Sequence, residues 1–268
     1  MDVKDAAIVV TGAGSGIGAA LARRFAAEGA AAVVVSDRDG TAAHVVAEPI
    51  GATPDTTDVT DPAAVADLVA RTESAHGRVD LFCSNAGIAT GVGIEAGDEA
   101  GDEGGDKAWR LAYDVHVMAH VYAARAVLPG MLARGHGYLL NTVSAAGLLI
   151  APGDAPYSAT KHAAIGLAQW LAVEYGDRGI GVSVLCPQGV STPLLMDPLA
   201  ADHPSARAVA AAGAIITPEQ VADAVVSGLA AETFLILPHP EVATYWSQLA
   251  ADPDRWLAGV RRMVAATT

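Results

Sequence analysis

The hydrophobic positions of the 268-residue chain form short apolar runs that alternate with segments of helical periodicity. The first run, residues 6–11, precedes an alanine-rich helical pattern over residues 16–28, and residues 31–36 form a β-branched run. A continuous apolar run of this length is typical of a strand buried on both faces of a sheet. Further strands are expected at residues 79–84, 137–144, 181–186 and 234–237.

Helical patterns separate these strands, and two of them carry clear start signals. Asp61 followed by Pro62 is an N-cap with proline at the first helical position, which predicts a helix to about residue 76. Residues 217–220, Thr-Pro-Glu-Gln, form a capping box that predicts a helix to about residue 230. Long helices are also expected at residues 108–133 and 157–175.

The alternation of strands and helices predicts the fold class. Chains of this pattern form a parallel, doubly wound α/β sheet with helices on both faces. A chain of 268 residues is long enough for one such domain with a large core, and no internal repeat or linker divides it. We therefore expect a single domain over residues 1–268.

Composition and charge narrow the range of partners. Apolar residues make up 52% of the chain and charged residues 17%, which argues against disorder. The net charge of −14 disfavours nucleic acid and anionic membrane surfaces as partners. A small molecule is the expected partner.

Cysteine usage and hydropathy predict the compartment. Cys83 and Cys186 lie in apolar, strand-like runs, where buried free thiols are expected rather than a disulfide. The charged N-terminal residues lead directly into a strand, and no apolar stretch is long enough for a membrane span. We expect a soluble cytoplasmic protein.

One segment, residues 91–106, interrupts the alternation. It is rich in glycine and carries six acidic residues: Glu95, Asp98, Glu99, Asp102, Glu103 and Asp106. The spacing of these residues does not match a helix-loop-helix calcium loop. A solvated loop insertion is expected, with a cation site or an anion-repelling lid as alternatives.

A glycine-rich turn follows the first expected strand and opens the first expected helix. Its sequence, Thr-Gly-Ala-Gly-Ser-Gly-Ile-Gly at residues 11–18, places Gly12, Gly16 and Gly18 where the backbone can approach a pyrophosphate. This context predicts dinucleotide binding at a helix N-terminus.

Asp37 ends the second expected strand, 19 residues after Gly18. A carboxylate at this position can accept hydrogen bonds from the adenosine ribose hydroxyls and repels a 2′-phosphate. Arg38 follows directly and can stack on adenine or offset that repulsion. We favour NAD as the cofactor, and NADP remains the alternative.

Tyr157 and Lys161 are four residues apart on an expected helix, so their side chains lie on one face, one turn apart. An ammonium group at this distance can lower the pKa of the phenol from about 10 towards the operating pH. Ser144 precedes this pair at the end of an expected strand. The three residues form a candidate proton-transfer group.

These motifs together resemble the short-chain dehydrogenase/reductase family, and specifically its one-domain members of about 250 residues. The resemblance covers nearly the whole chain and rests on the order and spacing of the motifs. They are the glycine-rich turn, Asp58-Val59, Asn85-Ala86-Gly87, Ser144, Tyr157-Ser-Ala-Thr-Lys161, and residues 186–192, Cys-Pro-Gln-Gly-Val-Ser-Thr. The resemblance implies a Rossmann-like fold and oxidoreductase activity.

The resemblance also implies residue roles. Ser144 would hydrogen-bond the substrate oxygen, Tyr157 would transfer the proton, and Lys161 would bind the nicotinamide ribose and lower the Tyr157 pKa. The residues expected to bind the cofactor are Gly12, Ser15, Gly16, Ile17, Gly18, Asp37, Arg38, Asp58, Val59, Asn85, Ala86, Gly87, Tyr157, Lys161, Pro187, Gly189, Val190 and Thr192. The two long helices resemble those that form the four-helix interface of the family, so a homotetramer, or a dimer, is expected.

The chain departs from the family pattern at two positions. His116 stands where an Asn of a proton relay is usual, and its backbone carbonyl is expected to keep much of that role. With His120 it has a zinc-compatible spacing, but no third ligand is suitably placed, so we expect no metal. Gln188 stands where glycine is common and is expected at the mouth of the site.

Apolar residues flank the catalytic motifs and predict the substrate class. Pockets are mostly apolar with few polar anchors. The expected substrate pocket comprises Ser144, Leu149, Tyr157, Gln188, Leu194 and Leu195, and residues 190–216 are expected to form a lid. We expect a neutral, fairly hydrophobic secondary alcohol and its ketone. The alternatives are an NADP-dependent carbonyl reductase and a non-catalytic NAD-binding sensor or scaffold.

Overall fold

The protein folds around a seven-stranded parallel sheet with the strand order β3-β2-β1-β4-β5-β6-β7. The computed structural model describes residues 1–95 and 105–266. The strands are β1 (Ala7–Thr11), β2 (Ala32–Asp37), β3 (Thr53–Thr56), β4 (Leu81–Ser84), β5 (Gly137–Thr142), β6 (Ile180–Leu185) and β7 (Leu235–Ile236). The order reverses between β1 and β4, which creates the crevice where doubly wound sheets bind ligands.

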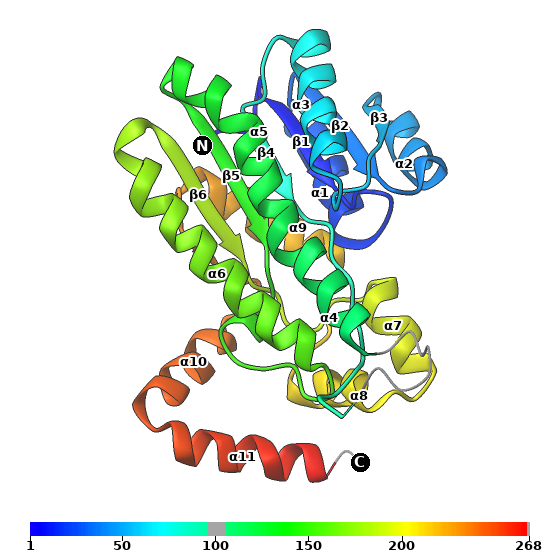
Figure 1. The fold of residues 1–268 in the computed structure, drawn as a ribbon, viewed down its shortest axis with the longest axis vertical. Coiled ribbons are helices and arrows are strands. Elements are labelled where there is room, and N and C mark those ends of the chain that lie inside the picture. The colour runs from blue at the N-terminus through cyan, green and yellow to red at the C-terminus, as the bar shows by residue number, and fades with distance from the viewer. Residues whose placement is uncertain (96–104, 267–268) are drawn as a thin grey trace.

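Helices cover both faces of the sheet, as Figure 1 shows. The helices are α1 (Gly16–Ala27), α2 (Gly40–Ala47), α3 (Pro62–His76), α4 (Asp106–Tyr113), α5 (Ala119–Arg134), α6 (Ala155–Tyr175), α7 (Pro193–Ala200), α8 (Pro204–Ala212), α9 (Pro218–Ala230), α10 (Glu241–Ala251) and α11 (Pro253–Ala265). On β1, Ile8 and Val10 pack on one face with α1, α2 and α9, whereas Val9 packs on the other face with α3, α5 and α6. The expected doubly wound α/β fold is confirmed.

Both predicted helix starts are present. The Asp61 carboxylate accepts a hydrogen bond from the backbone N–H of Ala63 at 2.8 Å and caps α3. Thr217 and Gln220 form the reciprocal capping box of α9. Among the described residues, no helix is long and apolar enough to cross a membrane.

The long helix expected at residues 108–133 is interrupted. A π-helical turn, Asp114–Met118 (η3), separates α4 from α5, and it carries His116. Such turns widen a helix by one residue and are frequent at functional sites. Apolar periodicity does not reveal them, because one extra residue shifts the pattern by only about a quarter of a turn.

Several elements were not expected from the sequence. Strand β3 is short, contains Pro54 and lies at the sheet edge, which is where proline is tolerated. Residues 190–216, expected as a lid, contain the helices α7 and α8. The last two helices, α10 and α11, extend beyond the carboxyl ends of the strands (Figure 1).

Candidate active site

Ser144, Tyr157 and Lys161 meet at the carboxyl ends of the central strands. Ser144 follows β5, and the other two lie one turn apart on α6. The Nζ atom of Lys161 lies 5.3 Å from the centroid of the Tyr157 ring and donates a hydrogen bond to the carbonyl of Thr142 at 3.2 Å. The structure therefore brings together all three residues of the predicted proton-transfer group.

The hydroxyl of Ser144 is held in place by the backbone around it. Its oxygen accepts a hydrogen bond from the N–H of Ala146 at 3.1 Å and donates one to the carbonyl of Pro187 at 3.4 Å. The same hydroxyl interacts with Tyr157, where it acts to lower the phenol pKa. Ser144 can thus orient a substrate oxygen beside the phenol.

The pKa values differ from the expectation that Lys161 lowers the pKa of Tyr157. Burial raises the pKa of Tyr157 to about 12, although the Ser144 hydroxyl opposes the shift. Lys161 is itself only 2% exposed, and burial lowers its pKa to about 7. A lysine that is only half protonated at neutral pH provides little positive charge to stabilise a phenolate.

His116 is fully buried and joins two parts of the site. Its Nε2 atom accepts a hydrogen bond from the backbone N–H of Ile88 at 3.1 Å, so Nδ1 carries the proton of the neutral ring. Nδ1 then donates to the hydroxyl of Thr160 at 2.8 Å, and this hydroxyl donates to the carbonyl of Pro156 at 2.7 Å. Burial lowers the His116 pKa to about 2, which keeps the ring neutral.

This arrangement makes His116 a positioning residue rather than a proton donor. The imidazole connects the segment after β4 to the helix that carries Tyr157, and it stacks edge-on against the phenol. Thr160, whose role was not expected from the sequence, completes the connection. Across the described residues, no group of three or more His, Cys, Asp or Glu side chains is placed to hold a metal ion.

The glycine-rich loop has the form of a phosphate cradle. Gly12 has a φ of +62°, and a Cβ atom there would lie 2.6 Å from the Cα atom of Ala86. A Cβ atom at Gly18 would collide with the carbonyl oxygen of Gly12. The Ser15 side chain does not cap α1, so the first N–H groups of this helix remain available to an anion. Ile17 packs against the core beneath them.

Asp37 closes the cradle at the end of β2. One carboxylate oxygen accepts from the N–H of Gly14 at 2.9 Å, and the other accepts from the N–H of Asp39 at 3.0 Å. The N–H of Thr60 is the largest cause of a lowered pKa of Asp58, and the hydroxyl of Thr60 adds to it. The exposed Arg38 lowers this pKa by a smaller amount. Asp37, Arg38 and Asp58 therefore surround the expected adenosine position.

The loop after β4 interlocks with the glycine-rich loop. The Asn85 amide donates to the carbonyls of Thr11 at 3.0 Å and Gly12 at 3.2 Å. A Cβ atom at Gly87 would lie 3.7 Å from Lys161 Nζ. Asn85 thus supports the loop, and the backbone of Ala86 and Gly87 faces the expected cofactor position. Val59, which was expected to contact the adenine, borders a small cavity together with Ala86.

Residues 187–192 approach the glycine-rich loop from the opposite side. A Cβ atom at Gly16 would lie 3.0 Å from Cγ2 of Thr192, which begins α7. Val190 pairs with Ile216 in an isolated parallel bridge that supports this segment, and the carbonyl of Gly189 accepts from the N–H of Ile216 at 3.0 Å. The backbone shape and donor groups of the site fit an extended dinucleotide.

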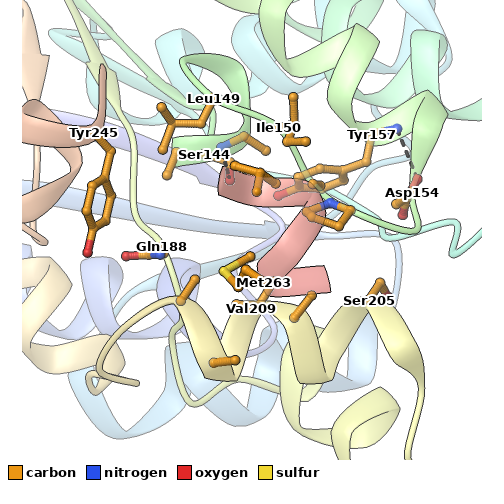
Figure 2. A pocket seen from close by; sticks show the side chains of 18 of the residues that line it. Ser144, Leu149, Ile150, Asp154, Tyr157, Gln188, Ser205, Val209, Tyr245 and Met263 are labelled. Atoms are coloured by element: carbon orange, nitrogen blue, oxygen red, sulfur yellow. Dashed lines mark hydrogen bonds between the residues drawn. The ribbon is translucent and has the colours of Figure 1, made fainter. Parts of the chain in front are cut away.

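A cavity of about 830 Å³ opens in front of Ser144 and Tyr157 (Figure 2). The residues expected to form the substrate pocket all lie on its wall: Ser144, Leu149, Tyr157, Gln188, Leu194 and Leu195. Helices α8, α10 and α11 also contribute to the lining. The expectation from the sequence did not include this contribution from the C-terminal helices.

Asp154 is a second residue whose role the sequence did not reveal. Its carboxylate accepts hydrogen bonds from the N–H of Thr90 at 2.7 Å, the hydroxyl of Thr90 at 2.6 Å, the N–H of Gly91 at 2.8 Å and the N–H of Tyr157 at 3.0 Å. It caps α6 and fixes the start of the acidic segment to the catalytic helix. An aspartate three residues before Tyr157 is a capping signal that could have identified it.

His239 supports the mouth of the cavity. Its Nδ1 atom accepts from the N–H of Gln188 at 3.1 Å, and Nε2 donates to the carbonyl of Ala214 at 3.1 Å. The ring is 2% exposed and lies between two prolines, Pro238 and Pro240, in the sequence. Its partners lie 25 and 51 positions away, so sequence spacing gave no signal for it.

The acidic segment can be described only in part. Asp98, Glu99, Asp102 and Glu103 lie outside the described residues, as does most of the predicted insertion. Asp106 begins α4 rather than ending a loop, and its carboxylate pairs with Arg110 at 3.2 Å.

Comparison with known proteins shows the family. A family model described as short chain dehydrogenase matches residues 6–202. A 1-deoxy-11-beta-hydroxypentalenate dehydrogenase of Streptomyces avermitilis is 33% identical over 264 residues, which cover 96% of this chain and 93% of the relative. A 2,5-dichloro-2,5-cyclohexadiene-1,4-diol dehydrogenase of Sphingobium indicum is 34% identical over 190 residues, 69% of this chain and 73% of the relative.

A solved structure is similar over almost the whole chain. It is a short chain dehydrogenase/reductase from Burkholderia phymatum in complex with NAD, with a TM-score of 0.83 and 28% sequence identity. The similarity covers 95% of this chain and 96% of that chain. With its parallel sheet, its glycine-rich cradle and the meeting of Ser144, Tyr157 and Lys161, the chain belongs to the short-chain dehydrogenase/reductase family and is an oxidoreductase that acts on CH–OH groups.

Proposed function

We propose that the protein is an NAD-dependent dehydrogenase that interconverts a neutral, fairly hydrophobic secondary alcohol and its ketone. The observation that carries the proposal is the position of Ser144 and Tyr157 on the wall of one largely apolar cavity, with Lys161 beside the phenol. In this proposal, Tyr157 is the proton acceptor and Ser144 the hydrogen-bond donor for a substrate hydroxyl that enters the cavity.

In the oxidation direction, Tyr157 takes the proton of the substrate hydroxyl, and in reduction it returns this proton to the ketone oxygen. Ser144 orients that oxygen and stabilises the negative charge that develops on it. A bound nicotinamide would supply the hydride chemistry, and the positive charge of its oxidised ring would favour the phenolate of Tyr157. The Nζ atom of Lys161 lies beside the ring of Tyr157 and is held there by its hydrogen bond to the carbonyl of Thr142.

The choice of NAD over NADP rests on Asp37. Its carboxylate stands at the end of β2 beside the glycine-rich loop, where a 2′-phosphate would meet negative charge. The similar Burkholderia phymatum structure is in complex with NAD, which supports the choice. The alternative, NADP with Arg38 on the 2′-phosphate, predicts the opposite cofactor preference.

The substrate class rests on the lining of the cavity. Leu149, Leu194 and Leu195 surround the position in front of Ser144 and Tyr157. One relative acts, by its name, on a cyclohexadiene diol, which is a neutral cyclic alcohol. A neutral cyclic or aryl alcohol therefore fits the cavity better than a small hydroxy acid.

The test measures NADH formation with NAD, and then NADPH formation with NADP, over secondary alcohols from short aliphatic to cyclic and aryl compounds. The Tyr157→Phe variant is the control, and we expect it to lose about 10²-fold or more in rate because the general base is removed. Much faster turnover of small anionic hydroxy acids would overturn the substrate class. Cofactor binding without turnover of any alcohol would favour the sensor alternative.

We also propose a cytoplasmic homotetramer, or a dimer, formed through the two long helical segments, which are α4 with α5, and α6. Leu111 and Tyr113 on α4 are 46% and 48% exposed, and Trp170 and Val173 on α6 are 55% and 85% exposed. Large apolar side chains exposed on two neighbouring helices are typical of an interface. Val173→Glu should lower the mass measured by light scattering, whereas Val45→Glu on α2 should not.

A further inference from the structure

Helix α11 directs its apolar face at the cavity. Trp256, Val260 and Met263 follow each other at helical spacing, so they lie on one side of the helix, and all three line the cavity. Arg255, Gly259 and Arg262 of the same helix also contribute to the lining. No residue of α11 is fully buried, and its main packing partners are α10 and α8. An amphipathic helix normally buries this face against a protein core. Here Trp256 packs against the edge of the core, and it lines the cavity together with Val260 and Met263.

The cavity that α11 covers is continuous with the catalytic site. The same 830 Å³ space is bounded by Ser144 and Tyr157, by Val209 of α8, and by Met263 of α11, as Figure 2 shows. Its volume lies in the upper part of the range for drug-sized ligands, which is roughly 300–1,000 Å³. A short aliphatic alcohol bound at Tyr157 would leave most of this space, and the apolar face of α11, in contact with water.

The face of α11 that Trp256, Val260 and Met263 form is the roof of the cavity, and it lies beyond the residues that the family model matches. The family model matches residues 6–202 and ends before α8, α10 and α11, whereas Ser144, Tyr157 and Lys161 lie inside it. The residues that perform the chemistry and those that cover the far end of the cavity therefore lie in different parts of the chain. Because one scaffold can serve many substrates, residues outside the proton-transfer group are the candidates for selecting the substrate.

We propose that Trp256, Val260 and Met263 are specificity-determining residues, and that the face of α11 binds the bulky alicyclic body of the substrate while its hydroxyl reaches Ser144 and Tyr157. This inference rests on the proposed function and adds the size and shape of the substrate. Large cyclic alcohols contact the roof, whereas small ones react at Tyr157 without reaching it. Removing or filling the roof therefore changes the preference between them.

The test compares two variants at cavity-lining positions of α11 with two control variants at exposed positions of the same helix. Gly259 lines the cavity, and a Cβ atom there would meet nothing nearer than a guanidinium nitrogen of Arg262 at 3.9 Å, so Gly259→Leu fills the cavity without a clash. Leucine is also a better helix former than glycine, so the variant should fold. Trp256→Ala enlarges the cavity. The controls are Leu257→Ala and Arg261→Leu, at exposed positions outside the cavity lining.

The readout is kcat and KM for cyclohexanol and for a bicyclic or tricyclic secondary alcohol. We expect Gly259→Leu to lower kcat/KM for the large alcohol by about 10-fold or more, through a higher KM. Trp256→Ala should have the same effect on the large alcohol. In both variants, kcat/KM for cyclohexanol should change by less than about 2-fold. The controls should match the parent enzyme for both substrates. Equal effects on both alcohols, or equal effects in the controls, would overturn the role of α11.

Failure of the inference is distinguishable from failure of the proposed function. Suppose that Tyr157→Phe abolishes turnover of both alcohols, while the α11 variants leave the ratio of kcat/KM for the two alcohols unchanged. The proposed function is then supported, and the proposed role of α11 is wrong. If Tyr157→Phe retains full activity, the proposed function fails whatever the α11 variants do. Thermal melts of each variant exclude misfolding as the cause.

Discussion

The ring of His116 stands edge-on to the ring of Tyr157, with centroids 5.3 Å apart and planes at 82°. The imidazole accepts from the N–H of Ile88 on one side and donates to Thr160 on the other. The phenol of Tyr157 thus packs against a neutral histidine, and both ring nitrogens of this histidine are hydrogen-bonded. The family pattern has an asparagine here, so the chain has replaced a short amide by a ring of fixed orientation.

His116→Ala should therefore disturb both stability and turnover. It removes the acceptor of the Ile88 N–H and the donor to the Thr160 hydroxyl, which keeps its bond to Pro156, and it leaves a cavity; together these should cost about 2–4 kcal/mol in the free energy of unfolding. We expect kcat to fall more than KM rises, because the phenol loses its support. His116→Asn keeps an acceptor and should recover part of both losses. Urea unfolding and steady-state kinetics measure them, and an unaltered His116→Ala enzyme would contradict the positioning role.

Lys161→Met should inactivate the enzyme and stabilise it near neutral pH. The pKa of Lys161 in the folded protein is about 7, below its ordinary value of 10.5. Between these two pH values the unfolded chain therefore binds more protons than the folded protein. The parent enzyme gains stability as pH rises through this range. Removing the buried amine should therefore raise the unfolding free energy by about 2 kcal/mol near pH 6.5, even after the loss of the hydrogen bond to Thr142. The gain should vanish towards pH 10.

Urea unfolding at several pH values checks this prediction, with Lys4→Met at an exposed lysine as the control. The control should show no pH-dependent gain. A Lys161→Met enzyme that is less stable than the parent by the same amount at every pH would show that the amine is not destabilised by burial.

His120→Leu should stabilise the protein most in acid. The side chain is 2% exposed, and neither ring nitrogen has a hydrogen-bond partner among the described residues. Burial lowers the pKa of His120 to about 3 from 6.5, so the unfolded chain binds more protons below pH 6.5 and this histidine costs stability as pH falls. The gain near pH 5 should exceed the gain near pH 8 by about 2 kcal/mol.

Thermal melts over this pH range measure the gain, and His44→Leu, at an exposed histidine, is the matched control. The result would contradict the structure if the two variants showed the same pH dependence, since only His120 is buried.

Asp37→Ser should shift the cofactor preference towards NADP. The substitution removes the carboxylate that repels a 2′-phosphate and that accepts from the N–H of Gly14. We expect the ratio of kcat/KM for NAD to kcat/KM for NADP to fall by about 10–100-fold. The variant loses the charged hydrogen bond to the N–H of Gly14 and the repulsion between the Asp37 carboxylate and a 2′-phosphate. Asp39→Ser, which keeps an N-cap on α2, is the control and should leave the ratio unchanged.

Local patterns predicted the fold because each element carries its own signal. The glycine-rich turn, the caps at Asp61 and Thr217 and the alternating apolar runs depend on neighbours within a few residues, and the doubly wound sheet follows from them. The same holds for Tyr157 and Lys161, whose relationship is one helical turn. Their convergence with Ser144 follows from parallel strands that end at one edge.

The contacts that the sequence did not predict join distant residues. The bonds of Asp154 to Thr90 and Gly91, and those of His239 to Gln188 and Ala214, join residues that are 25 to 64 positions apart. The altered pKa of Lys161 results from burial, which the sequence does not state. The C-terminal helices were missed because half-buried apolar residues such as Trp256 also suit a surface loop or a subunit contact.

The amide of Asn85 reaches back across 74 positions to the carbonyl of Thr11, and the neighbouring Gly12 contacts Ala86. Such long-range contacts form late in folding, because a large loop must close before they exist. The phosphate cradle is consequently incomplete until β4 has docked beside β1. During synthesis, a chain that ends before residue 85 has the whole glycine-rich motif but lacks the contacts that shape it. NAD binding should therefore act as a kinetic probe, appearing only when the centre of the sheet has closed.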